Sequence, residues 1–274
     1  MHQTGSTAAA AAEGTVATPT LAVAVLTFNE AARIGACLQS AAWADQLIVV
    51  DSGSTDDTVE RARAAGAEVL VHADWQGFAV QRNRQLAQVR CDYVFFLDAD
   101  ETMSPAFRQE LAAVVRSDSR AVWQVRWRMV AFGQELRFFR ALSKVERLFR
   151  RDQIEGWTGV VHEEALLRNP QAERQVMRTP LSHHSRETVR ASLDKMTQYA
   201  MLGAAKRAAS GQRGGIWRGL ASGSAMFFRM YVVRLGFLCG GAGFLYCLFI
   251  ALEAFFRYAA LHYDRHALSE RVGR

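Results

Sequence analysis

Several features are scarce or missing in the 274-residue sequence, and each absence excludes a class of protein. The four cysteines form no CxxC pair and no Cys/His spacing typical of a metal site, so we expect small buried residues in a reducing compartment. Residues 1–18 lack the basic start and long apolar stretch of a secretory signal, and we expect a disordered lead-in. With 50% hydrophobic and 22% charged residues, the chain is neither globally disordered nor a polytopic membrane protein.

Acidic residues are missing from a long part of the C-terminal quarter. Residues 203–252 contain six Lys and Arg residues and no Asp or Glu, which suits an anionic surface. Within this part, residues 235–252 carry no charge and as a helix would extend about 27 Å, slightly less than a bilayer core. The apolar content favours lipid over nucleic acid, so we expect no nucleic-acid partner.

Four glycines interrupt the uncharged run, at positions 236, 240, 241 and 243. We therefore expect residues 216–260 to associate with a membrane as a broken helix or hairpin lying in the interface. A true span, and burial in a dimer or against the rest of the chain, are the alternatives.

Short apolar runs alternate with helical patterns in the first hundred residues. The runs at 21–30, 46–51, 67–71 and 93–97 have the continuous apolar character of strands buried on both faces of a parallel sheet. We expect Asn29 to cap the helix after the first strand and Ser104-Pro105 to open the helix after the fourth. This alternation predicts an α/β fold with a Rossmann-like open, mostly parallel sheet flanked by helices.

The pattern changes after the fourth strand. We expect further strands at 121–133 and 145–151, a loop leading into a strand or helix at 156–166, and an amphipathic helix at 186–209. The sequence thus predicts an α/β domain over 19–185, with halves 19–103 and 104–185, followed by a helical C-terminal region over 186–274.

Acidic side chains follow two of the predicted strands. Asp98 and Asp100 are two residues apart, which places both carboxylates on one side of an extended backbone, and Asp51 ends another strand. An isolated pair of this kind is usually a capped turn. Because these acids end successive buried strands, where ligands of open α/β sheets bind, a site for a divalent cation and a diphosphate is favoured. Glu101 is expected to point away and only to support the loop.

Three motifs, LAVAVLTFNE, VVDSGSTDDT and FFLDADE, resemble the nucleotide-sugar half of family 2 inverting glycosyltransferases with the GT-A fold. Later motifs are similar to the lipopolysaccharide-core β-1,4-glucosyltransferase branch, namely GFAVQRNRQLA, RLFRRD, VHEE, HHS and the GFL-x-G-x-x-G of 236–243. The resemblance extends over about residues 20–262.

The resemblance implies a set of site residues and a cofactor. The nucleotide sugar would contact Thr27, Asn29, Glu30, Asp51, Arg82, Asp98 and Arg150. Asp98 and Asp100, with His184 as a further candidate, would hold Mg²⁺ or Mn²⁺. Inversion requires a base that takes the proton of the acceptor hydroxyl, and we expect Glu163 in this role, with Glu164 as the second candidate.

Several of these side chains also have purely structural interpretations. Arg147, Arg150 and Arg151 suit phosphate or form a solvated edge strand, and Arg82 and Asn83 serve the donor or helix packing. Trp123, Trp127 and Trp157 stack on sugars or fill the core, and core packing is favoured.

The leading hypothesis is a metal-dependent hexosyltransferase on the cytoplasmic face of the inner membrane. It would move a hexose, expected to be glucose, from a UDP-sugar to a lipid-linked saccharide such as an inner-core heptose of lipopolysaccharide. Alternatives are a glycosyltransferase acting on polyprenyl phosphate or another cell-envelope glycan, and a non-catalytic membrane-associated scaffold. A nucleotidyltransferase is disfavoured, because TFNEAARIG stands where a Gly-rich, basic triphosphate loop would be expected.

Overall fold

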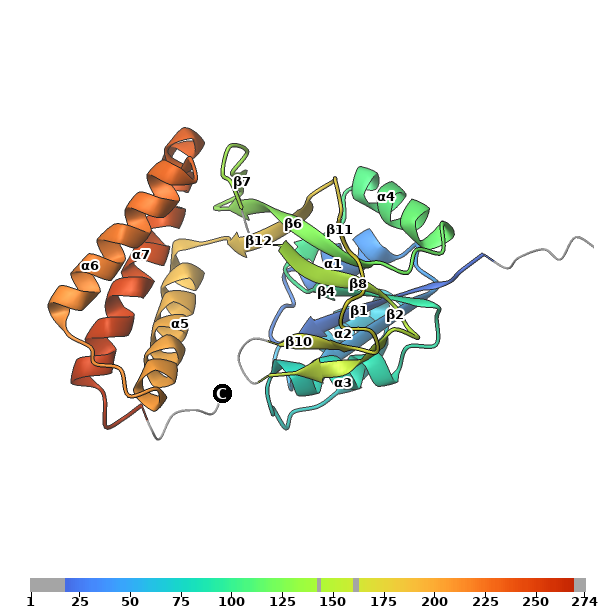
Figure 1. The fold of residues 1–274 in the computed structure, drawn as a ribbon, viewed down its shortest axis with the longest axis horizontal. Coiled ribbons are helices and arrows are strands. Elements are labelled where there is room, and N and C mark those ends of the chain that lie inside the picture. The colour runs from blue at the N-terminus through green and yellow to red at the C-terminus, as the bar shows by residue number, and fades with distance from the viewer. Residues whose placement is uncertain (1–17, 142–143, 160–162, 269–274) are drawn as a thin grey trace, which may run out of the picture.

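A computed structural model of the chain describes residues 18–141, 144–159 and 163–268 (Figure 1). The expected lead-in over 1–18 therefore lies almost wholly outside the described residues. The strands are β1 (Leu21–Thr27), β2 (Gln46–Asp51), β3 (Glu68–Val71), β4 (Tyr93–Asp98), β5 (Glu101–Thr102), β6 (Val122–Ala131), β7 (Gln134–Glu135), β8 (Lys144–Arg150), β9 (Ile154–Thr158), β10 (Glu164–Leu167), β11 (Arg174–Val176) and β12 (Leu181–Arg186). The α-helices are α1 (Ile34–Ala41), α2 (Thr58–Ala64), α3 (Phe78–Ala87), α4 (Pro105–Arg116), α5 (Val189–Ala209), α6 (Ile216–Phe228) and α7 (Gly240–Tyr263).

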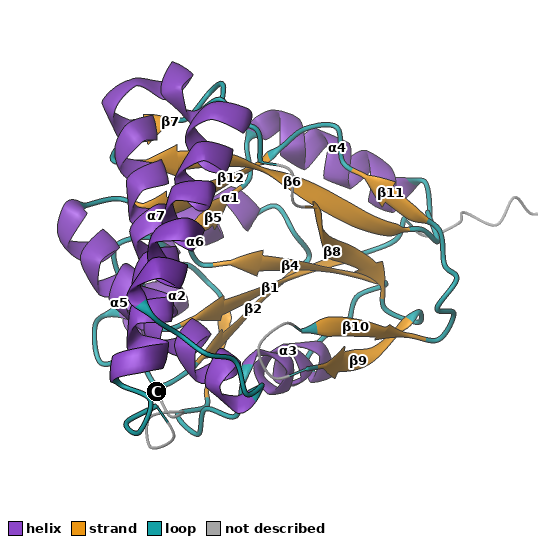
Figure 2. Cartoon of the chain, turned by 60° about the vertical axis from the view of Figure 1, so that its left-hand side comes forward, coloured by secondary structure: helices purple, strands orange, loops and turns teal. Residues whose placement is uncertain are grey.

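One large sheet organises the first part of the chain, with strand order β3-β2-β1-β4-β8-β6-β12-β5 (Figure 2). Strands β1 to β4 are mutually parallel, whereas β8 runs antiparallel to both β4 and β6. Strands β9 and β10 form a separate antiparallel hairpin. The fold is therefore the predicted α/β type with a mostly parallel sheet at its centre.

Apolar side chains from both faces of the sheet build two cores. On one face, Ile34 and Leu38 of α1 and Phe107 and Leu111 of α4 pack against β1 and β4. On the other face, α3 and the β9–β10 hairpin cover the sheet, with Trp157 among the buried residues. Every residue of β1 is buried, which explains its unbroken apolar sequence.

The sequence predicted these strands well, and it predicted one helix cap correctly and one wrongly. Ser104 is the N-cap of α4 and accepts a hydrogen bond from the Phe107 N–H at 3.2 Å. Asn29 caps no helix, because α1 begins only at Ile34. Asn29 instead adopts a left-handed backbone (φ 53°), and its Oδ1 accepts a hydrogen bond from the Thr55 N–H at 2.9 Å. It thereby holds the turn that follows β2.

Three helices follow β12 and lie beside the sheet (Figure 1). Helices α6 and α7 form a hairpin, joined by a π-helical turn (Arg229–Val233) and a 3-10 turn (Gly236–Cys239), and α7 also packs on α5. Gly219 and Gly223 of α6 face α7 so closely that an added Cβ would lie 2.9 Å from the Phe255 carbonyl oxygen and 3.1 Å from that of Ala251. The hairpin therefore depends on small residues at its contact.

Replacing Gly219 with valine is expected to separate α6 from α7. Overpacking of this kind costs about 1 to 3 kcal/mol, so thermal unfolding should occur roughly 2 to 10 °C lower. Gly241→Val is the matched control, because a Cβ at Gly241 meets nothing within 4 Å. Equal melting temperatures for the two variants, measured by circular dichroism, would show that the close contact does not limit stability.

Candidate active site

Strand register brings the predicted polar side chains to one edge of the sheet. Thr27 at the end of β1 pairs with Asp51 at the end of β2, and Leu26 pairs with Asp98 at the end of β4. Because these strands are parallel, their carboxyl ends form a common edge where ligands bind in open α/β sheets. Thr27 is buried there, and its hydroxyl has no hydrogen-bond partner within the described residues.

The Asp51 carboxylate is occupied by its own turn. It is fully buried, and it accepts hydrogen bonds from the Gly53 N–H at 2.9 Å, the Ser54 N–H at 2.7 Å and the Ser54 hydroxyl at 2.5 Å. The sequence predicted contact with the nucleotide. In the structure Asp51 shapes the loop at this edge, together with Asn29, and its contact with the nucleotide stays a prediction.

Glu30 forms an ion pair at the start of the next segment. Its Oε2 lies 2.5 Å from the Arg33 guanidinium, and Arg33 also reaches the His184 carbonyl oxygen at 3.4 Å and Glu187 at 4.0 Å. Burial raises the pKa of the Glu30 carboxyl despite the neighbouring Arg33 charge. This pair joins the first strand's loop to the end of β12.

Two buried arginines hold Asp98. Arg82 of α3 donates to Oδ1 and Arg147 of β8 donates to Oδ2, both at 2.5 Å, and the two arginine side chains are 3% and 5% exposed. Burial alone would raise the pKa of Asp98, but the Arg147 and Arg82 charges outweigh it and hold that pKa well below its ordinary value. Asp98 is therefore an ionised counter-charge for two arginines, and its role as a metal ligand stays a prediction.

Glu101 supports the loop from a fully buried position. Its carboxylate accepts hydrogen bonds from the Asp98 N–H at 2.9 Å, the Trp127 indole at 2.6 Å and the Arg147 guanidinium at 3.0 Å. The prediction that it supports the loop fits these contacts. The contacts also make Glu101 a central part of the core, in contrast to the accessory role that the sequence indicated.

Asp100 faces a different set of partners from Asp98. Its Oδ2 lies 3.2 Å from His183 Nε2 and 3.8 Å from Lys195 Nζ of α5. Burial would lower the pKa of His183, but the hydrogen bond and charge of Asp100 raise it above the ordinary value. Within the described residues no group of three His, Cys, Asp or Glu side chains could hold a metal ion.

The side chain of His183, rather than that of the predicted His184, meets the Asp100 carboxylate, whereas the His184 backbone N–H donates to the Asp100 carbonyl oxygen at 2.8 Å. The His184 ring lies 3.3 Å from the Thr102 hydroxyl, because neighbouring side chains of a strand point to opposite sides. Asp100 and His183 therefore provide one oxygen and one nitrogen donor. This pair fits a divalent cation that takes its other ligands from water and a diphosphate.

Glu163 lies at the same site, whereas Glu164 points elsewhere. Glu163 Oε1 is 3.9 Å from Arg82 Nε, a buried atom without a hydrogen-bond partner among the described residues. Glu164 is an exposed residue of β10, paired with Thr158 of β9. Residues 160–162 of the VVHEE motif lie outside the described residues. Of the two candidate bases, only Glu163 contacts the cluster around Asp98.

Arg150 lies far from this site, so its predicted contact with the donor requires correction. It pairs with Tyr93 at the beginning of β4 and forms ion pairs with Asp118 and Asp152. Because β8 is antiparallel to β4, its last residue lies at the edge opposite Asp98. Arg147, three residues earlier, is the arginine of this motif that reaches the site.

Trp157 and Asn83 make contacts within the core of the protein. Trp157 packs edge to face against Phe96 and Phe149 in the core. The Asn83 side chain accepts a hydrogen bond from the Trp157 N–H at 2.8 Å and donates to the Trp157 carbonyl oxygen at 3.0 Å. It thereby fixes the β9–β10 hairpin on α3, beside Arg82. Core packing was the favoured interpretation for the tryptophans.

Comparison with known proteins gives a consistent family relationship. A sequence model described as Glycosyl transferase family 2 matches residues 22–168. The lipopolysaccharide core biosynthesis glycosyltransferase LpsC of Rhizobium meliloti is 29% identical over 262 residues, which cover 92% of this chain and 94% of LpsC. An uncharacterized glycosyltransferase of Rickettsia prowazekii, RP128, is 34% identical over 132 residues, or 46% of this chain and 45% of that protein.

Among solved structures, glucosyl-3-phosphoglycerate synthase from Mycobacterium tuberculosis is similar. In complex with Mn²⁺, UDP and phosphoglyceric acid it has a TM-score of 0.45 and 22% identity, over 65% of this chain and 74% of the synthase. In complex with Mn²⁺, UDP and glucosyl-3-phosphoglycerate it has a TM-score of 0.37 and 26% identity, over 48% of this chain and 57% of the synthase. The chain spans 53% of the length of a further mycobacterial protein that it matches.

Proposed function

Because the chain belongs to glycosyltransferase family 2, we propose that it moves a hexose, with inversion, from a UDP-sugar to a lipid-linked saccharide. The single observation that carries the proposal is the convergence of Asp100, His183 and Glu163 with two arginines at the carboxyl edge of the sheet. The similarity to LpsC, a lipopolysaccharide core biosynthesis glycosyltransferase, along nearly the whole chain supports a lipopolysaccharide-core saccharide as the acceptor. Glucose as the hexose and an inner-core heptose as the acceptor are part of the proposal.

The donor would lie at the sheet edge with its diphosphate near Asp100. Asp100 and His183 would hold Mg²⁺ or Mn²⁺, and when bound this ion would offset the charge that develops on the leaving diphosphate. Asp98 keeps Arg82 and Arg147 in fixed positions, and their charge adds to the field at the same edge.

The acceptor reacts from the other side of the sugar ring. As its hydroxyl oxygen forms a bond to the anomeric carbon, the bond from that carbon to the diphosphate oxygen breaks and UDP leaves. Glu163 takes the proton of the hydroxyl. The carboxylate is well placed for this step, since it is 25% exposed and lies at the boundary between the arginines and solvent.

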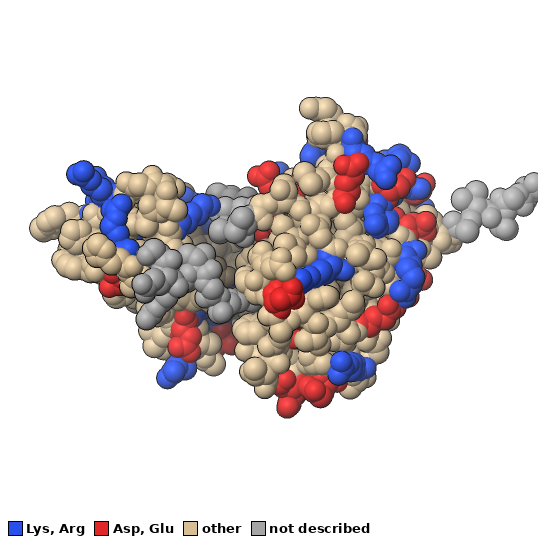
Figure 3. Space-filling model, turned by 90° about the horizontal axis from the view of Figure 1, so that it is seen from below, with Lys and Arg blue, Asp and Glu red and all other residues tan. Residues whose placement is uncertain are grey.

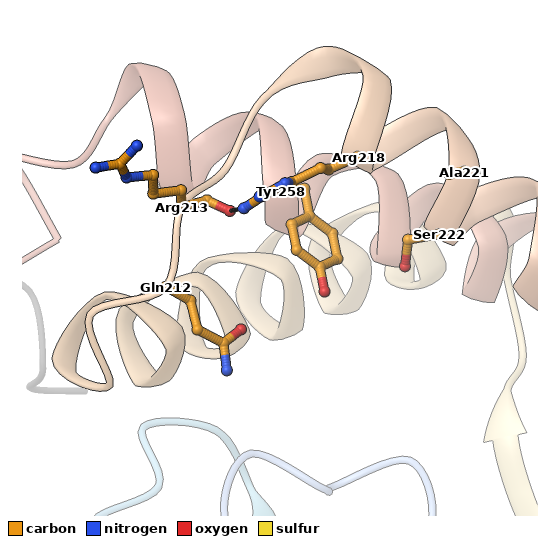
Figure 4. Close-up of a pocket in the computed structure, with 6 residues that line it drawn as sticks. All are labelled: Gln212, Arg213, Arg218, Ala221, Ser222 and Tyr258. Carbon is orange, nitrogen blue, oxygen red and sulfur yellow. Dashed lines mark hydrogen bonds between the residues drawn. The ribbon is translucent and has the colours of Figure 1, made fainter.

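We further propose that the α6–α7 hairpin binds the membrane surface. Large apolar side chains cover its outer side, among them Trp217, Leu220, Phe228, Val233, Phe237 and Leu238. Figure 3 shows basic side chains along the outer edge of this helical part, with largely uncharged surface beside them. At its base a cavity of about 510 Å³ is lined by Gln212, Arg213, Arg218, Ala221, Ser222 and Tyr258 (Figure 4). This combination suits an anionic interface.

The packing of α7 favours an interfacial position over a span. Within the described chain, Gly236–Tyr263 is one helix that is long and apolar enough to be a candidate membrane span. Its 18-residue apolar stretch has a mean hydropathy of 1.8, and 39% of that stretch is buried inside the protein. One end of α7 packs on the sheet domain, where Tyr246 meets Phe139, and the other end packs on α5. The Arg140 N–H also donates to the Arg234 carbonyl oxygen at 3.0 Å. Because α7 is held by the sheet domain at one end and by α5 at the other, we propose that it lies along the membrane, on the cytoplasmic face of the inner membrane.

A donor and acceptor screen tests the enzyme proposal. Purified full-length protein with Mg²⁺ or Mn²⁺ should release UDP from UDP-glucose only when lipid A–core acceptors are added. UDP release with polyprenyl phosphates instead would favour the alternative acceptor. Release from no nucleotide sugar with any acceptor would favour a non-catalytic scaffold.

A flotation assay tests the membrane proposal. Because arginines and exposed aromatic side chains border the apolar face, the protein should float with anionic liposomes, and high salt should weaken this binding. Failure to float with either anionic or neutral liposomes would overturn the interfacial position.

A further inference from the structure

Lys195 brings a positive charge from the helical region to the sheet edge. It lies on α5, outside the part of the chain that the family model matches, which ends at residue 168. Its Nζ is 3.8 Å from Asp100 Oδ2 and donates to the Ser185 carbonyl oxygen at 3.3 Å. The side chain is 32% exposed, so the ammonium group is open to solvent and to a ligand.

The neighbouring cations are engaged in tighter pairs. Arg33 is 2.5 Å from Glu30, and Arg82 and Arg147 are each 2.5 Å from Asp98. At 3.8 Å, Lys195 makes no hydrogen bond to Asp100, and the Ser185 carbonyl oxygen uses only one of its three N–H donors. Lys195 therefore has both the charge and the donors to bind a further anion.

We propose that Lys195 binds the diphosphate of the nucleotide-sugar donor, an inference that rests on the proposed glycosyltransferase function. A diphosphate placed beside Asp100 comes within reach of Lys195. A flexible ammonium group is a compact charge that suits phosphate oxygens. Charge balance agrees, because the carboxylate of Asp100 would repel a diphosphate unless cations stand beside it. The helical region thus contributes a substrate-binding residue to the catalytic domain.

Nucleotide binding by the full-length protein tests this assignment. With Mn²⁺ present, the dissociation constants of UDP and uridine are measured by calorimetry for the wild type, Lys195→Met, Lys195→Arg and Lys206→Met. Lys206 is an exposed lysine of the same helix and serves as the matched control. Lys195→Met should weaken UDP binding by about 10- to 100-fold and leave uridine binding unchanged. Lys195→Arg should recover part of the loss, and Lys206→Met should bind both ligands like the wild type.

Three results would overturn the assignment. UDP binding by Lys195→Met within twofold of the wild type would show that Lys195 does not contact the diphosphate. Equal weakening of UDP and uridine would indicate a distorted site. Weaker Mn²⁺ binding by Lys195→Met in the absence of nucleotide would indicate that Lys195 only positions Asp100, because removal of a positive charge should not by itself weaken cation binding. Wild-type protein that binds GDP but not UDP would instead contradict the proposed donor.

Discussion

Glu163→Gln is expected to lower kcat by about 10²- to 10⁴-fold, the usual loss when a general base is removed. Glutamine keeps the shape of the side chain beside Arg82 but cannot accept the proton of the acceptor hydroxyl. UDP binding should remain within about twofold, because the role proposed for this carboxylate is toward the acceptor and not toward the nucleotide. The rate is measured as UDP release in the presence of acceptor, and binding is measured by calorimetry.

Glu164→Gln provides the matched control for this prediction. Glu164 is adjacent in sequence, but it is exposed on β10 and has no contact with Arg82 in the described residues. It should keep a nearly unchanged rate. A comparable loss in both variants, or a loss confined to Glu164→Gln, would show that the base has been assigned to the wrong carboxylate.

Asp98→Asn is expected to destabilise the protein in addition to removing activity. The substitution leaves Arg82 and Arg147, both buried, without the charge that they share. Breaking a buried pair in this way costs about 3 to 5 kcal/mol, and the 35% exposure of Asp98 places the expected cost near the lower end. Thermal unfolding should occur roughly 6 to 12 °C lower, as measured by calorimetry.

The Asp100→Asn variant distinguishes a ligand-binding carboxylate from a structural one. Among the described residues, the Asp100 side chain contacts His183 and, at longer range, Lys195. Its loss should therefore change the melting temperature little while abolishing metal-dependent UDP binding. If Asp98→Asn were as stable as the wild type and Asp100→Asn were not, the division between a structural and a ligand-binding carboxylate would be reversed.

The stability that Asp98 contributes should also depend on pH in a defined direction. Its pKa in the folded protein lies below the ordinary value, because the arginine charges outweigh burial. The contribution is therefore fully present above the ordinary carboxyl pKa of about 4 and is lost as the pH falls towards the lower folded value. In Asp98→Asn the loss of stability across this acid range should be smaller.

Most of the fold could be predicted from local sequence patterns. Continuous apolar runs identified β1, β2 and β4, since strands buried on both faces need such runs. The rule that ligands bind at carboxyl ends of parallel strands then placed Asp98 and Asp100 at a site. The predicted helix cap at Asn29 was wrong, because its side chain bonds to a turn that is 26 residues distant in sequence.

The predictions of site residues were wrong or incomplete where strand direction or long-range contacts determine which side chain reaches the site. Nothing in RLFRRD indicates that its strand runs antiparallel to β4, which sends Arg150 away and brings Arg147 to Asp98. The choice between His183 and His184 depends on the phase of β12 beside β5. Lys195 had no motif to mark it, because α5 meets Asp100 only through the tertiary fold.

The position of β12 determines which fragments of this enzyme can keep an intact sheet. This strand lies between β6 and β5 inside the sheet, and it leads directly into α5. A fragment that ends at residue 168, where the family match stops, would lose an internal strand as well as His183 and Lys195. The smallest autonomous catalytic piece must therefore extend through α5. If Lys195 and the α6–α7 hairpin act as proposed, exchange of C-terminal regions between related enzymes would carry part of the donor site along with the membrane-binding helices.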